Sequence, residues 1–422
     1  HEDAALKEKW EIFFKKSSLE GGDTSVSQCA VSGKLLPIAR IHSKIKGVYG
    51  GLPTGSVLIG FNNASENSYG NEQSYNSNIS EEVMKKYTEA LNYLLNDGRH
   101  KAMLDDMTII FWAMNAEETC EYTFQQMLWG TPDKMNAERT ENMLRDMVEE
   151  AKSGYLTEKS LQSIDMIQEN VDFYMLGLKP NSSRLSVKFL VRKKYAEILW
   201  NIARFQMDLQ VTHEIKPVYL SWIKKELVSP KSSNEKVNPA LAASLFDAIV
   251  YGSSYPEALL ETVVRRVKTD GGKIKDIRAG LIKACINRSE KKEELKVALD
   301  KENKNPAYLC GRLFAVLEKL QQEASNNSLN RTIKDAYFSS AAAKPVLVFP
   351  KLVKLAQNHM RKVKYPTYNK LIGEIMGNLP GEFPERLSLK DQGRFIVGYY
   401  QQYEKFFEKS GKTEEQNEME GK

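Results

Sequence analysis

The chain has 422 residues, enough for two or three domains, and its 60 lysines and arginines against 55 acidic residues give a net charge of +5. This modest charge does not identify a nucleic-acid-binding protein, so any such site has to come from local clusters. The four cysteines form no C-x-x-C pair, which argues against a zinc ribbon or redox motif and is typical of a reducing cytosol. No signal peptide or membrane-spanning apolar run is present, and we expect a cytoplasmic protein with no membrane partner.

The first half of the chain mixes short strands and helices. Residues 4–16 have an amphipathic helical pattern, and residues 25–41 can form strands around a turn. Residues 42–55, rich in glycine and lysine, predict a loop. The apolar runs 57–61 and 108–113 are typical of buried strands. Further helices are predicted over 81–95, where Ser80 is a good N-cap, and over 117–128, 139–152 and 194–209, and further strands over 171–178 and 185–191.

The second half is predicted to be helical throughout. Residues 229–239, rich in Pro, Ser, Asn and Lys, form the best candidate linker. Helical periodicity then recurs over 239–251, 256–267, 273–288, 306–324, 349–363, 368–379 and 388–407. We therefore predict an α+β protein: a mixed α/β body with short strands over 1–230, an all-α helical bundle over 231–410 and a flexible tail over 411–422.

Side-chain amides crowd the segment that follows residues 57–61. They are Asn62, Asn63, Asn67, Asn71, Gln73, Asn76 and Asn78. Amides carry both donors and acceptors, and such groups read base edges and contact phosphates without relying on charge. The alternative is an ordinary polar loop, because Asn, Gly and Ser form turns, and composition alone favours that interpretation.

Motifs of enzymes are incomplete in this sequence. Residues 271–274 lack the upstream glycine and the hydroxyl residue of a phosphate-binding loop, and His213 has no second histidine at helical spacing. Residues 43–46 fit Ser-x-x-Lys, a pattern that is common by chance. His42 is better explained as a structural or phosphate-contacting residue than as a base. We therefore expect no catalytic centre, metal or cofactor, with an overlooked carboxylate nuclease as the alternative.

Two segments concentrate basic residues. Residues 265–292 hold ten lysines and arginines against three acids, and residues 344–370 hold seven against none. A surface that only needs solubility usually mixes both signs, so the acid-free segment favours a polyanionic partner over a solvated helix face. The candidate backbone-binding residues are Arg265, Arg266, Lys273, Lys275, Arg278, Lys351, Lys354, Arg361 and Lys362.

Arg184, Lys188 and Arg192 alternate along a predicted strand. We add Arg184 and Lys188 to the backbone-binding candidates. A solvent-facing strand edge explains the same pattern equally well.

Ordered motifs across most of the chain resemble one protein family. They are residues 29–33 (CAVSG), 38–47 (IARIHSKIKG), 61–73, 87–95, 108–113 (TIIFWA), 176–187, 308–315 (YLCGRLFA) and 391–395 (DQGRF). In this order they are similar to the large subunit of the type I-C CRISPR surveillance complex, Cascade (the Csd-one, or Cas-eight-c, family). Members carry substantial sequence upstream of the first motif, so we expect an N-terminal portion to be missing here.

The resemblance implies a non-catalytic DNA-recognition subunit. Such subunits recognise the protospacer-adjacent motif, help to open the duplex, stabilise the R-loop and present the DNA to a helicase-nuclease, while the guide RNA reads the target. The implied partners are the crRNA-containing backbone, the subunits at the crRNA 5′ end, small subunits and target double-stranded DNA. The candidate motif-reading residues are Lys44, Lys46, Asn62, Asn63 and Gln73. A nucleic-acid-binding scaffold outside CRISPR remains the alternative.

Overall fold

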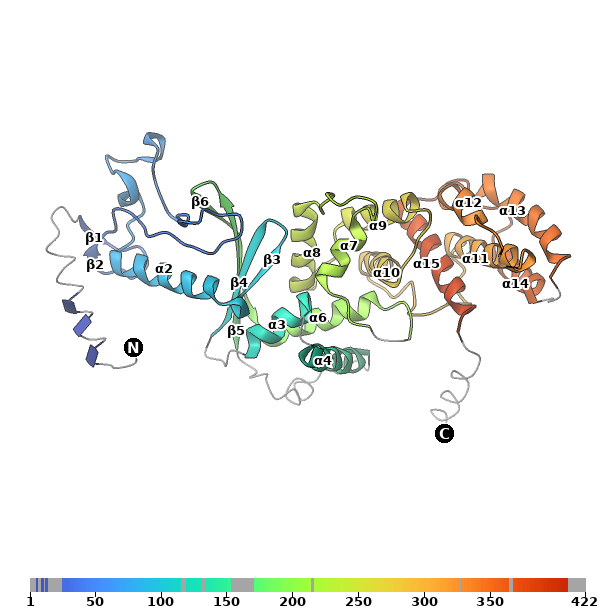
Figure 1. Cartoon of the computed structure of the whole chain (residues 1–422), viewed down its shortest axis with the longest axis horizontal. Helices are drawn as coiled ribbons and strands as arrows, with labels where there is room; N and C mark the ends of the chain where they lie inside the picture. The colour runs from blue at the N-terminus through green and yellow to red at the C-terminus, as the bar shows by residue number, and fades with distance from the viewer. Residues whose placement is uncertain are drawn as a thin grey trace. The chain divides into compact units, whose positions relative to one another are not determined.

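The structure, a computed structural model, describes residues 5–6, 9–10, 12–13, 25–114, 119–130, 134–152, 171–213, 216–326, 328–363 and 367–408. The chain divides into two compact units (Figure 1). The first unit comprises His1–Gln125 and Met166–Tyr195, and the second comprises Gln126–Asp165 and Ala196–Lys422. The helix predicted over 4–16 lies largely, and the tail predicted over 411–422 wholly, outside the described residues.

The described strands form two antiparallel sheets in the first unit. They are β1 (Val26–Gln28), β2 (Leu35–Pro37), β3 (Lys101–Leu104), β4 (Met107–Ala113), β5 (Asp172–Asn181) and β6 (Arg184–Lys194). β1 pairs with β2, and the other four strands have the order β3–β4–β5–β6. The register places Ile110 opposite Leu176, and a β-bulge interrupts the β5–β6 ladder at Gly177/Leu178. The strands predicted over 108–113, 171–178 and 185–191 are confirmed.

Helix α2 (Glu81–Asn96) packs against one face of the four-stranded sheet. It begins after the predicted cap, because the Ser80 hydroxyl accepts a hydrogen bond from the Val83 backbone N–H at 3.4 Å. The apolar core beneath the helix contains Ile45, Leu91, Leu95, Ile110, Leu176, Leu178 and Leu185. The side chains of adjacent strand residues point to opposite faces of the sheet, so Phe111 of β4 and Phe173 of β5 point to the other face. There they pack with Phe124 and Tyr195. The ring centroids are 5.1 Å apart for Phe111 and Phe124, 5.0 Å for Phe124 and Phe173, and 5.2 Å for Phe173 and Tyr195.

The strand predicted over residues 57–61 is wrong. Only Ser56 and Val57 make bridges, to Ile45 and Arg184 respectively, and the following residues bend away. Short apolar runs are ambiguous because strand, buried turn and helix segments share them. Of residues 57–61, only Val57 bonds to the backbone at the edge of β6. Its N–H donates to the Ser183 carbonyl, and its C=O accepts from the Leu185 N–H.

Helices make up the described part of the second unit, and the predicted α+β class is confirmed. They are α3 (Thr119–Trp129) and α6 (Tyr195–Leu209), which both begin in the first unit, then α4 (Lys134–Lys152), α7 (Leu220–Leu227), α8 (Pro239–Tyr251), α9 (Glu257–Thr269), α10 (Asp276–Glu290), α11 (Pro306–Ala324), α12 (Ile333–Ala341), α13 (Pro345–Met360), α14 (Thr367–Gly377) and α15 (Leu389–Lys405). The predicted linker over 229–239 lies within the second unit, between α7 and α8. Helices α7 and α12 were not predicted.

The core of the second unit centres on the crossing of α11 and α15. Glycines let the two backbones approach, since a Cβ on Gly311 would lie 2.0 Å from the Phe395 carbonyl oxygen. The ring of Phe314 packs edge-on against those of Phe338, Phe349 and Phe395, with centroids 5.6–6.3 Å apart. This aromatic core fixes α12 and α13 against α11.

Candidate nucleic-acid interface

Ile45 anchors a basic loop, residues 40–47, to the core of the first unit. Its side chain is buried, and its backbone forms an antiparallel bridge with Ser56 through two N–O contacts of 2.9 Å. Successive side chains of an extended segment point to opposite sides, so Lys44 and Lys46 are exposed on either side of the buried Ile45. The basic loop thus presents two lysines on a fixed backbone.

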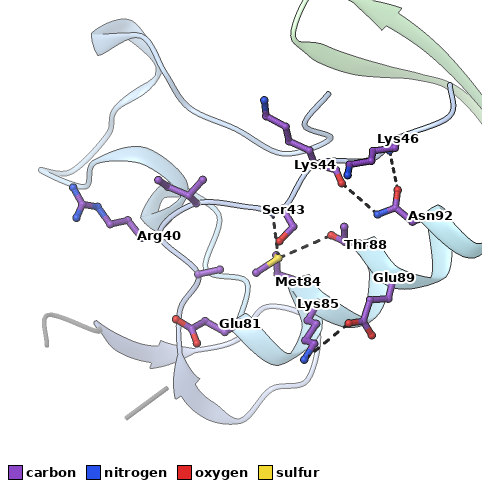
Figure 2. Close-up of a pocket in the computed structure, with 12 residues that line it drawn as sticks. Arg40, Ser43, Lys44, Lys46, Glu81, Met84, Lys85, Thr88, Glu89 and Asn92 are labelled. Carbon is purple, nitrogen blue, oxygen red and sulfur yellow. Dashed lines mark hydrogen bonds and ion pairs between the residues drawn. The ribbon is translucent and has the colours of Figure 1, made fainter. Parts of the chain in front are cut away.

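Asn92 of α2 fixes the basic loop from the other side (Figure 2). Its Oδ1 accepts from the Lys46 backbone N–H at 2.8 Å, and its Nδ2 donates to the Lys44 carbonyl at 3.3 Å. Gly55 passes close by with a φ of +90°, and a Cβ there would lie 2.9 Å from the Ile45 carbonyl oxygen. Only glycine fits this position without displacing the loop.

A cleft of about 630 Å³ lies between the basic loop and α2 (Figure 2). Its polar lining includes Arg40, Ser43, Lys44, Lys46, Glu81, Lys85, Thr88, Glu89 and Asn92. Lys85 is 4.0 Å from Glu89, whereas Lys44 and Lys46 form no ion pair within the described residues. The excess of unpaired positive charge on the loop side suits an anionic ligand such as a phosphate.

His42 does not reach the surface of the basic loop. The ring is buried, its Nδ1 lies 2.6 Å from the Tyr87 hydroxyl, and burial lowers the pKa of the imidazole. A neutral, buried imidazole positions the loop and does not contact phosphate. Of the two roles considered for His42, the structure supports the structural one.

Asn76 organises the Asn-rich loop, residues 61–79. Its Nδ2 donates to the carbonyl oxygens of Asn71 and Gln73 at 3.1 and 2.9 Å, and its Oδ1 accepts from the Ser68 N–H at 2.8 Å. One amide therefore closes the loop on itself, as expected where a side chain replaces backbone partners in a turn. Part of the amide content of this segment serves the fold.

The predicted amide readers differ in what they already bind. Gln73 Oε1 accepts from Arg40 Nε at 2.8 Å, and Asn63 Nδ2 donates to Glu66 Oε1 at 3.1 Å. Asn62 is exposed, and within the described residues its side-chain amide has no hydrogen-bond partner. Among these three amides, Asn62 is the one whose donor and acceptor both remain available for a base edge.

Arg184 and Lys188 have different environments on β6. Arg184 Nη1 and Nη2 lie 2.6 and 2.8 Å from the two carboxylate oxygens of Glu66, so its guanidinium ties the Asn-rich loop to the sheet. Lys188 is exposed and forms no ion pair in the described part of the chain. Arg192, further along the strand, pairs with Asp172 at 2.7 Å. Lys188 therefore remains the accessible backbone-binding candidate on this strand.

The basic residues of α9, of α10 and of the turn between them are divided between the interior and the surface. Arg266 forms an ion pair with Asp270, and Arg278 lies 2.8 Å from Asp270 and 2.9 Å from Glu226. Both arginines are buried, a placement that suits a structural role. Arg265 and Lys273 are exposed, while Lys275 pairs with Glu226 at 2.5 Å through a largely exposed side chain.

Helix α13 and the two residues after its end carry the exposed basic residues that the acid-free segment predicts. Lys351, Lys354, Arg361 and Lys362 are all exposed and form no ion pair within the described residues. The Lys351 ammonium lies 5.1 Å from the centre of the Tyr337 ring, a cation–π contact that leaves its charge uncompensated. Leu347, 70% exposed, adds apolar area beside these charges. We call these four basic residues the α13 basic face.

Sequence reasoning missed the residues that position the candidates. Asn92, Asn76 and Glu66 act through hydrogen bonds to the backbone or to an arginine, and nothing in their own sequence neighbourhood marks that role. Arg40 lies in the motif 38–47, yet the sequence gives no separate sign of its contact with Gln73.

In the described part of the chain, no group of three or more His, Cys, Asp or Glu side chains could hold a metal ion. None of the described helices is both long and apolar enough to cross a membrane.

Comparison with known families identifies a match over nearly the whole chain. The family model described as CRISPR-associated protein (Cas_Csd1) matches residues 1–407, nearly the whole chain. None of the curated proteins matches the chain. The family resemblance inferred from the ordered motifs is thereby confirmed.

Proposed function

The chain belongs to the Cas_Csd1 family of CRISPR-associated proteins, and we propose that it is the subunit of a type I-C Cascade complex that recognises the protospacer-adjacent motif. In such complexes the guide RNA reads the target by base pairing, so the protein needs to read only a short motif in the duplex. The proposed role needs side chains that reach base edges from a rigid support.

The observation that carries the proposal is the fixation of Lys44 and Lys46. Ile45 between them is buried, Asn92 bonds the backbone on both sides, and both lysine side chains stay exposed and unpaired within the described residues. Lysine contacts guanine edges in the major groove and also binds phosphate. The exposed amide of Asn62 adds an uncharged donor and acceptor from the same unit.

The α13 basic face supports the second part of the proposal, which is R-loop stabilisation. Four exposed cations that form no ion pair within the described residues suit binding to a phosphate backbone regardless of base sequence. We propose that this face contacts a DNA strand exposed by duplex opening. The proposed partners are the crRNA-containing subunits, small subunits and the recruited helicase-nuclease, in the cytoplasm. The proposed role contains no catalytic step.

The test measures binding of the assembled crRNA complex to duplexes that share one guide-matched target and differ only in the flanking motif. The wild-type complex should prefer one motif, and Lys44→Ala with Lys46→Ala should weaken binding to that motif at least tenfold, with a smaller effect on other motifs. Lys86→Ala, whose ammonium pairs with Glu82 at 2.6 Å, is the control and should leave the preference intact. Equal binding of all motifs by the wild-type complex would refute the proposal.

A further inference from the structure

Tyr69 lies in the middle of the Asn-rich loop. Its side chain is fully exposed, and its backbone has a φ of +53°. Gly70, the next residue, has a φ of +76°. A left-handed conformation is uncommon for an aromatic residue, and the fold gains no buried apolar area from this ring. The ring is therefore presented to solvent by the loop and does not stabilise it.

The segment beneath Tyr69 is fixed by hydrogen bonds on both sides. Asn71 N–H donates to the Ser68 carbonyl at 2.9 Å, closing the turn that carries the ring. Asn76 bonds to Ser68 before the ring and to Asn71 after it. The Glu66–Arg184 ion pair then ties this turn to β6. An aromatic side chain on a pre-organised turn loses little freedom when it meets a partner.

The surroundings of Tyr69 favour a nucleobase over a protein surface. Aromatic anchors at protein interfaces sit within a cluster of other contacts that exclude water. Between residues 62 and 78, Tyr69 is the one large hydrophobic side chain that is exposed, and most of the other residues in this range carry amides or hydroxyls. The carboxylate of Glu66 is neutralised by Arg184, and Glu72 remains exposed, so the turn is not a phosphate site. A lone exposed ring that follows Ser68 and precedes Gly70, both uncharged, matches the requirement for stacking on one base.

We propose that Tyr69 stacks on an unpaired nucleobase of the DNA beside the recognised motif. This inference rests on the proposed DNA-recognition function and assigns the ring a role that no predicted reading residue has. Stacking is tolerant of base identity, because every base has a π-face. Tyr69 therefore contributes affinity for opened DNA, and the lysines and amides contribute the preference for a motif.

The test compares wild type with Tyr69→Asn and Tyr69→Trp in the assembled complex. Asparagine adopts a left-handed φ readily, so it removes the ring while keeping the turn. The probes are a forked duplex with two unpaired bases beside the motif, one of them 2-aminopurine, and the same duplex fully paired. Wild type and Tyr69→Trp should bind the fork with a fluorescence change, and Tyr69→Asn should bind it about tenfold more weakly and lose that change.

Tyr93→Ala, which removes an exposed tyrosine of α2, is the matched control and should behave as wild type. If wild type and Tyr69→Asn bind the forked duplex equally well, the stacking role is refuted while DNA recognition stands. If Tyr69→Asn instead impairs assembly of the complex, the ring is a protein contact and the inference is wrong. If wild type binds neither DNA, both the proposed function and this inference fail.

Discussion

The carboxylate of Glu66 and the guanidinium of Arg184 form a two-point ion pair, with N–O distances of 2.6 and 2.8 Å, that joins the Asn-rich loop to β6. The hydrogen bonds from Arg184, and those from the backbone of Asn63 and Asn62, lower the pKa of Glu66 to about 2. Fork-to-fork geometry of this kind is both directional and charge-assisted. The position of the loop therefore depends on an ionised Glu66.

Glu66→Gln and Arg184→Met should each loosen the Asn-rich loop. We expect amide hydrogen exchange of residues 61–79 to accelerate at least tenfold in both variants at pH 7, because the tie to β6 is removed. Because the folded pKa lies below the ordinary value of 4.5, the stabilising contribution is fully present above about pH 4.5 and is lost as the pH falls toward 2.

Loop protection in the wild type, corrected for intrinsic exchange rates, should therefore be equal at pH 7 and pH 5. Arg192→Met is the control, since Arg192 pairs with Asp172 away from the loop. A loss of protection between pH 7 and pH 5 would contradict this account of the ion pair.

Two measurements, motif affinity and hydrogen exchange of the Asn-rich loop, should distinguish the roles of Asn62, Asn63 and Gln73. Asn62→Ala should reduce affinity for the preferred motif about tenfold without changing hydrogen exchange of the loop, since its side-chain amide makes no hydrogen bond within the described residues. Asn63→Ala and Gln73→Ala should accelerate exchange, because their amides bind Glu66 and Arg40. Motif preference is measured by competition between matched duplexes. Unchanged preference in Asn62→Ala would place the reading residues elsewhere.

Much of the helical architecture could be predicted because its signals are local. Ser80 before α2, and Asn238–Pro239 before α8, combine a cap with apolar periodicity inside one short window. Helices α7 and α12 have eight and nine residues, too few for a clear period. Residues 57–61 were misjudged because pairing depends on which strand edge lies nearby, and that is a tertiary property.

The candidate site was predicted only in part, for the same reason. The exposure of Lys44 and Lys46 follows from a loop sequence, but the Asn92 side chain that fixes them lies 46 positions beyond Lys46 along the chain. Composition also cannot separate amides that close turns, such as Asn76, from amides that face solvent, such as Asn62. Likewise, the sequence does not distinguish the buried arginines of α9 and α10 from the exposed ones. The distinction depends on the position of their acidic partner in the fold.

The α13 basic face should bind the DNA backbone without base preference. Replacing Lys351, Lys354 and Arg361 by alanine should weaken binding evenly across sequences. It should also flatten the dependence of log K on log salt by about one unit for each phosphate that the variant no longer neutralises. Binding is measured from about 50 to 200 mM salt. Lys275→Ala, which removes a similarly exposed cation already paired with Glu226, should change the slope little. An unchanged slope in the triple variant would make this face a solvated helix surface.

Arg278 should matter for stability and not for DNA binding. The residue is 4% exposed, and its guanidinium contacts both Asp270 and Glu226, so Arg278→Ala leaves two acids with less compensation inside the second unit. Breaking a buried ion pair from one side typically lowers the free energy of unfolding by about 3–5 kcal/mol. We expect about 3 kcal/mol here, because Arg266 and Lys275 still neutralise part of the acidic charge.

Urea denaturation measures the loss, and the exposed Lys273→Ala control should change stability by less than about 0.5 kcal/mol. At a temperature where Arg278→Ala stays folded, its salt slope for DNA should equal that of wild type. A reduced slope with unchanged stability would instead make Arg278 a phosphate contact.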